Sequence, residues 1–220
     1  MIIPSSSWRH IWRSARNIGL AVLLLFAAAP ILGAHAASDL PRDIAQLYRS
    51  VSISPPTAKA MTVCYGFVCR RRETLDFSAA DRAALSRLLA AGRPSPEAER
   101  AAISRAVIWF DRKMGPHIGT SKRVARADFR SGSDHTNYDC WDTTRNVTSL
   151  LLVLQSWNML HHHSAGNPHY RGNVLQLQTP HNTAVVVEKA SRREWAVDMW
   201  TRGYGEAPEI MPVSAWAKEK

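Results

Sequence analysis

The chain has 220 residues and carries 28 lysines and arginines against 18 aspartates and glutamates, which gives a net charge of +10. This charge favours anionic surroundings, such as a membrane surface or a cell-envelope polymer. The basic residues are dispersed and lack the interleaved aromatic side chains of a nucleic-acid platform, so we expect no nucleic-acid partner.

Residues 1–36 have the pattern of a secretory signal peptide. Three arginines and no acidic residue precede an apolar run at 18–33, and an A-x-A site ends at Ala36. The pattern predicts cleavage near Ala36 and Ala37 and a periplasmic or secreted protein. The alternative is a membrane anchor, but the run is shorter than the ~20 residues of a spanning helix and contains Pro30.

Residues 37–220 are expected to form a single domain, because their number is typical of one domain with its own core. The first half, 37–135, is predicted to be mainly helical. The second half, 136–220, is predicted to hold a cysteine-bearing helix and a sheet. No stable membrane span is expected in this mature chain.

Cysteines Cys64, Cys69 and Cys140 follow the leader. The first two lie in an extended segment, 57–77, and a tight turn at Gly66 would bring them within disulfide reach. In an oxidising compartment we expect this bond to form. Cys140 is then left over, either as a buried structural thiol or as a reactive one, and its polar flanks favour the reactive thiol.

Two helices with clear end signals are predicted between the disulfide and Cys140. Ser78 and Asp81 form a capping box at the start of the first, and Gly92 marks its end. Ser95 opens the second, and the Gly-Pro pair at Pro116 is predicted to end it.

The next helix is predicted from about Asp139 or Cys140 to Leu160 and is strongly apolar. A loop at 161–173 should follow it, and then three β-rich segments, at 174–179, 181–190 and 194–200. Helices followed by strands predict an α+β fold in which the cysteine helix packs as the central helix on an antiparallel sheet.

The last two β-rich segments should form a hairpin that brings His181 beside Asp198. A helix N-terminus and an adjacent imidazole both activate a thiol, so Cys140 is the predicted nucleophile and His181 its base. Asp198 would orient the imidazole. The structural alternative for Asp198 is an ion pair with a neighbouring arginine, namely Arg192, Arg193 or Arg202.

These residues resemble the transglutaminase-like branch of the papain-like superfamily, and bacterial transglutaminase-like cysteine proteinases in particular. The resemblance rests on the order Cys140, His181, Asp198, on the "CW" at the helix start, on the "H-x-x-A" that opens a strand and on the "W-x-V-D-x-W" of the next. It covers about residues 137–216. It implies a papain-like fold, with Cys140 as nucleophile, His181 as base and Asp198 as orienting acid.

The sequence departs from that pattern in one respect, since no glutamine stands shortly before Cys140 to donate to an oxyanion. The candidate donors are the backbone N–H of Cys140 and a side chain of Asn137, Tyr138 or Trp141. Trp200 is a candidate for the wall of the cleft.

Four histidines, His161, His162, His163 and His169, suggest a metal site. Adjacent histidines point in different directions and no carboxylate or thiol is close in sequence, so a solvated helix C-terminus is the favoured interpretation. We expect neither metal nor cofactor.

The predicted function is that of an exported, cysteine-dependent amide hydrolase or acyl transferase acting on a protein or peptide-like amide in the cell envelope. The alternative is a non-catalytic module that keeps the fold and binds an anionic envelope polymer through its basic surface.

Overall fold

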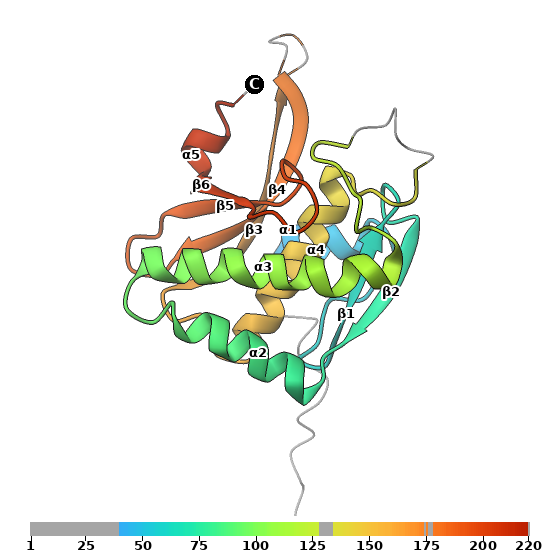
Figure 1. The fold of residues 1–220 in the computed structure, drawn as a ribbon. Helices are drawn as coiled ribbons and strands as arrows, with labels where there is room; N and C mark the ends of the chain where they lie inside the picture. Colours follow the sequence, from blue (N-terminus) through green and yellow to red (C-terminus); the bar gives the residue numbers. More distant parts are fainter. Residues whose placement is uncertain (1–39, 128–133, 174, 176–177, 220) are drawn as a thin grey trace, which may run out of the picture. The chain divides into compact units, whose positions relative to one another are not determined.

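A computed structural model describes residues 40–127, 134–173, 175 and 178–219 (Figure 1). The predicted signal peptide lies outside these residues, as do residues 174, 176 and 177 of the β-rich segment predicted at 174–179. All described residues belong to one compact unit of the chain. Within that described part, no helix has the length and apolar character needed to cross a bilayer.

The elements confirm the predicted α+β class. The first group comprises α1 (Arg42–Arg49), β1 (Ala60–Tyr65), β2 (Arg71–Asp76), α2 (Ala79–Ala90) and α3 (Pro96–Ile118). The second group comprises α4 (Cys140–Ser156), β3 (His163–Asn173), β4 (Gln178–Glu188), β5 (Glu194–Asp198), β6 (Glu209–Pro212) and α5 (Val213–Trp216).

Helix α4 is the central element, between the sheet and a separate hairpin (Figure 1). The sheet has the strand order β3-β4-β5-β6 and is antiparallel throughout, and β1 pairs with β2 in the hairpin. Helix α4 packs against β3 and β4 and also against β1. Its apolar residues Val147, Leu151 and Leu154 are fully buried. Each fully buried leucine contributes about 2 kcal/mol of transfer free energy, so this stripe anchors the helix start firmly.

The segment after α4 differs from the prediction. The helix ends at Ser156 and not at Leu160, because Asn158 has a left-handed backbone conformation with φ 57°. The predicted loop at 161–173 contains the long strand β3. This strand has no apolar alternation to reveal it, and its backbone is ordered by its hydrogen-bonded partner β4.

Helix α3 extends one turn beyond the predicted stop, since Pro116 lies inside it and Gly119 caps it with φ 79°. Proline has no N–H for the carbonyl of Arg112. That carbonyl instead accepts a hydrogen bond from the hydroxyl of Tyr204 at 3.4 Å. A Cβ at Gly115 would lie 2.3 Å from the Tyr204 ring, so the glycine is needed for the tyrosine to approach.

Other local predictions are confirmed. Cys64 and Cys69 form a disulfide, and Cys140 is a free cysteine. Ser78 and Asp81 form the capping box of α2. Strands β4 and β5 form the predicted antiparallel hairpin, with Ala184 opposite Val197.

Candidate active site

Cys140 is the first residue of α4, and the helix start is fixed from both sides. The side chain of Asp139 caps the helix by accepting from the N–H of Asp142 at 2.7 Å. Asn146, which lies about two turns into α4, is fully buried. Its side-chain amide accepts a hydrogen bond from the N–H of Cys64 and donates one to the carbonyl of Cys64, both at 2.8 Å. The hairpin that carries the disulfide is thereby tied to the helix that carries the free thiol.

The turn between β1 and β2 also binds the helix start, through hydrogen bonds that the sequence analysis did not predict. Backbone N–H groups of Phe67 and Cys69 donate to the carboxylate of Asp142 at 2.9 and 2.6 Å, and the N–H of Val68 donates to Asp139 at 2.7 Å. Successive N–H groups arranged in this way form an anion-binding concavity. The only sequence signal for it is the pair of aspartates on either side of Cys140.

The backbone of this turn is unusual in having four consecutive positive φ angles. The values are 73°, 69°, 53° and 56° for residues 66 to 69, of which only Gly66 is a glycine. Non-glycine residues rarely adopt this region, and a run of them is sustained only by surrounding constraints. Here the constraints are the disulfide at the ends of the turn and the carboxylates of Asp139 and Asp142.

His181 and Asp198 are joined on the sheet. The Nε2 atom of His181 lies 2.5 Å from Oδ2 of Asp198, and both side chains are about 1 % exposed. The same oxygen accepts from Nε1 of Trp216 at 2.9 Å, and the other accepts from the N–H of Trp200 at 3.1 Å. Asp198 thus has its partners within the site, whereas Arg202, one of the arginines considered as its partner, pairs with Glu209.

Two tryptophan rings hold the imidazole in place. The ring centroid of Trp200 lies 4.5 Å from that of His181, and that of Trp216 lies 5.4 Å away. Trp216 is fully buried and belongs to α5, a short helix that the sequence analysis did not predict. The guanidinium of Arg171 lies over Trp216 at 4.4 Å and also binds Glu219. The C-terminal segment therefore fixes the orientation of the histidine and aspartate.

Cys140 and His181 line the same cavity, which has a volume of about 500 Å³. Its other side chains are mostly apolar or aromatic and include Phe67, Trp141, Tyr170, Pro180 and Trp200. The Nδ1 atom of His181 is buried and has no hydrogen-bond partner within the described part of the chain. Because Nε2 is occupied by Asp198, Nδ1 is the nitrogen left to exchange a proton.

Asn182, the neighbour of His181, contacts the cysteine directly. Its side-chain amide lies 3.5 Å from Sγ of Cys140. Both ends of the amide are satisfied when its oxygen accepts from Nε1 of Trp141 at 3.2 Å and its nitrogen donates to the Cys140 carbonyl at 2.7 Å and to Oγ1 of Thr144 at 2.6 Å. In this orientation the oxygen faces Sγ, so the side chain supplies no donor there.

The electrostatics keep the thiol protonated at rest. Burial is the main cause that raises the pKa of Cys140, to about 11, and the negative charge of Asp139 adds to it. The backbone N–H of Asn182 acts in the opposite direction, and the charge of Asp198 raises the pKa further. Burial and the charge of Asp139 also raise the pKa of Asp142, to about 7.

The structure separates the predicted oxyanion and cleft candidates into two groups. Trp141 and Trp200 line the cavity. Asn137 does not, because its amide oxygen accepts from the N–H of Val124 at 2.8 Å and its nitrogen donates to Asp134 at 2.7 Å. Tyr138 is buried elsewhere, with its hydroxyl 3.1 Å from Thr120. Of the predicted donors, the backbone N–H of Cys140 and the side chain of Trp141 remain at the cavity, and Nε1 of Trp141 donates to Asn182.

The predicted solvated helix end at the histidine cluster is corrected. His163 is fully buried, and its Nδ1 lies 2.7 Å from the carboxylate of Glu99, which is also fully buried. His169 pairs instead with Glu194 at 3.0 Å. Among the residues that the structure describes, no three histidine, cysteine or acidic side chains are grouped as metal ligands.

Comparison with known proteins gave no match to a protein-family model, to a curated protein or to a solved structure.

Proposed function

We propose that this protein is an exported, cysteine-dependent amide hydrolase or acyl transferase of the transglutaminase-like, papain-like type, with Cys140, His181 and Asp198 as its catalytic triad. The observation that carries the proposal is the imidazole of His181, which Asp198 holds through one nitrogen and which has no partner at the other among the described residues. That ring lines the same cavity as the one free cysteine within the described residues. A nucleophile, a base and an orienting acid are the three parts that thiol catalysis requires.

The raised pKa of the thiol points to a general-base mechanism instead of a resting thiolate–imidazolium pair. As Sγ of Cys140 attacks the amide carbon, Nδ1 of His181 takes the thiol proton. The carbonyl oxygen becomes an oxyanion, which the N–H of Cys140 at the start of α4 would stabilise. His181 then gives the proton to the departing amine and a thioester remains. Water releases the acid in a hydrolase, and an amine forms a new amide in an acyl transferase.

The apolar lining of the cavity supports a neutral, peptide-like substrate. A cavity of about 500 Å³ has the volume of an ordinary small-molecule site. Its aromatic walls would bury the bound amide, and apolar surroundings strengthen the interaction between Asp198 and His181. A protein or peptide amide in the cell envelope would be accessible to an exported enzyme, and its uncharged backbone suits an apolar cavity.

The test is the alkylation of Cys140 by iodoacetamide at neutral pH. We expect His181→Ala to slow alkylation by ~100-fold, because general-base assistance is lost. The matched control is His169→Ala, which removes an imidazole paired with Glu194 outside the cavity. Equal rates in the wild type, His181→Ala and His169→Ala would rule out the proposed role of His181.

The alternative function is a non-catalytic module that binds an anionic envelope polymer. Two observations favour it: the raised pKa of Cys140, and the commitment of Asn137 and Tyr138 to partners away from the cavity. If alkylation proves independent of His181 while the protein still binds a polyuronate, the alternative is the better description.

A further inference from the structure

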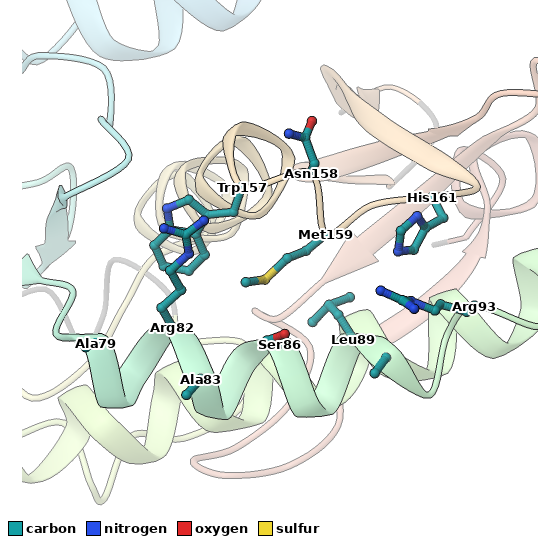
Figure 2. A pocket seen from close by; sticks show the side chains of 11 residues that line it. Ala79, Arg82, Ala83, Ser86, Leu89, Arg93, Trp157, Asn158, Met159 and His161 are labelled. Carbon is teal, nitrogen blue, oxygen red and sulfur yellow. The ribbon is translucent and has the colours of Figure 1, made fainter.

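A second cavity, remote in sequence from the triad, lies between α2 and the residues that follow α4 (Figure 2). Its volume is about 430 Å³. Arg82, Leu89 and Arg93 line it from α2 and the turn after it, and Met159 and His161 line it from the other side. None of its described lining residues is acidic.

The basic groups of this cavity are available to a ligand. The guanidinium of Arg93 and the ring of His161 have no hydrogen-bond or ion-pair partner within residues 40–127, 134–173, 175 and 178–219. Arg82 lies over the ring of Trp157, with 5.5 Å from its guanidinium carbon to the ring centroid, and makes no ion pair with any residue that the structure describes. Uncompensated guanidinium groups are well suited to bind carboxylates.

The backbone beneath these groups is held firmly. Nε1 of Trp157 donates to the carbonyl of Ala58 at 3.0 Å. The N–H of His161 donates to buried Glu99 at 2.5 Å, and Nε2 of His162 lies 2.8 Å from the carbonyl of Arg93. The two walls therefore keep their spacing while only the ends of the basic side chains need to be ordered on binding, which limits the entropic cost.

The middle of the cavity is apolar. Figure 2 shows the thioether of Met159 pointing toward α2, with Arg82 on one side of it and Arg93 and His161 on the other. Leu89 forms the facing wall. A helix rises about 1.5 Å per residue, so the part of α2 from Arg82 to its end at Ala90 spans on the order of 12 Å, which is roughly four residues of extended peptide, and Arg93 lies in the turn beyond it.

We propose that this groove binds an acidic peptide segment in which carboxylates flank one or two apolar side chains. The carboxylates would pair with Arg82 at one end and with Arg93 and His161 at the other. The apolar side chains would pack mainly on Met159, because Leu89 is only 2 % exposed. That apolar centre favours a peptide over an anionic polysaccharide, which has no apolar side chain to place there.

The experiment is fluorescence anisotropy with the full chain and a labelled peptide Glu-Glu-Leu-Leu-Glu-Glu. We expect Arg82→Gln with Arg93→Gln to weaken binding by ~10-fold or more, since two charge-assisted contacts are lost. The matched control is Arg42→Gln with Arg87→Gln, two exposed arginines that do not line the cavity. It removes the same net charge, and we expect binding to change by less than ~2-fold.

Three outcomes would overturn the proposal. Equal weakening by the two double variants would mean that only net charge matters. Binding of a polyuronate as tight as that of the peptide, at equal carboxylate concentration, would assign the groove to a polysaccharide. The apolar centre is tested by Met159→Gln, which should weaken the leucine peptide by ~3-fold and leave a serine-substituted peptide unchanged; equal effects on both peptides would exclude the apolar contact.

Discussion

The Nε2 atom of His181 and Oδ2 of Asp198 lie 2.5 Å apart, although the two residues are 17 positions apart in the chain. They meet because β4 and β5 form a hairpin in which Ala184 faces Val197. The same carboxylate oxygen also accepts a hydrogen bond from Nε1 of Trp216. The histidine is therefore oriented by a network that extends to the C-terminal helix.

Trp216→Phe tests this network. The substitution keeps a ring over His181 but removes the N–H that binds Asp198, so we expect a loss of about 2 kcal/mol in the free energy of unfolding. We also expect slower alkylation of Cys140, because the imidazole is less well oriented. Urea unfolding and iodoacetamide kinetics measure the two effects.

The control for that change is Trp195→Phe, since Nε1 of Trp195 has no hydrogen-bond partner among the described residues. It should leave the alkylation rate unchanged. If the two variants slow alkylation to the same extent, the hydrogen bond to Asp198 does not position the histidine.

The pH dependence of alkylation should reveal the protonated resting thiol. Burial and the charge of Asp139 raise the pKa of Cys140 from 9.0 to about 11, so the thiolate fraction should keep growing as the pH rises past 9. We expect the alkylation rate of His181→Ala, in which the base is absent, to increase up to at least pH 10. Asp139→Asn should move this curve to lower pH. A rate that is already constant at pH 9 would contradict the raised pKa.

Removal of the disulfide should loosen the start of α4. Cys64→Ser with Cys69→Ser opens a short loop, for which we expect a loss on the order of 2 kcal/mol in the free energy of unfolding. The turn whose N–H groups bind Asp139 and Asp142 would lose its closure, so Cys140 should also be alkylated faster. Reduction of the wild type with dithiothreitol should reproduce both effects, and if it changes neither, the disulfide does not control the turn.

Glu99→Gln is expected to destabilise the fold by about 3 kcal/mol, because it breaks a buried pair with His163. The control is Glu97→Gln on the same helix, where Glu97 is exposed and pairs with Arg100. That change should leave the urea midpoint almost unchanged.

The buried pair also has a pH signature. Burial alone would raise the pKa of Glu99, but hydrogen bonds from His163 and from the N–H groups of His161 and His162 outweigh it and lower the pKa below 4.5. A depressed carboxyl pKa stabilises the fold above the unfolded value, and this contribution disappears as the pH falls through the folded value. On acidification below pH 4.5, the wild type should therefore lose more stability than Glu99→Gln. Parallel losses would argue against a charged Glu99.

Local patterns predicted much of the framework. The capping box at Ser78, the start of α4 at Cys140 and the disulfide all follow from neighbouring residues, whose own chemistry selects the conformation. The hairpin of β4 and β5 was predictable for the same reason, since apolar β-branched runs flank a short polar turn. Strand β3 was not, because its residues carry no alternation and its order comes from pairing.

The sequence by itself determined the α+β class and the candidate residues Cys140, His181 and Asp198. Tertiary structure decided what surrounds them, since Trp216 reaches Asp198, and the turn of residues 67–69 reaches Asp139 and Asp142, through contacts between segments distant along the chain. It also raised the pKa of the thiol and directed Asn137 and Tyr138 away from the cavity. Burial and long-range hydrogen bonds depend on how whole elements pack, and no short stretch of sequence specifies that packing.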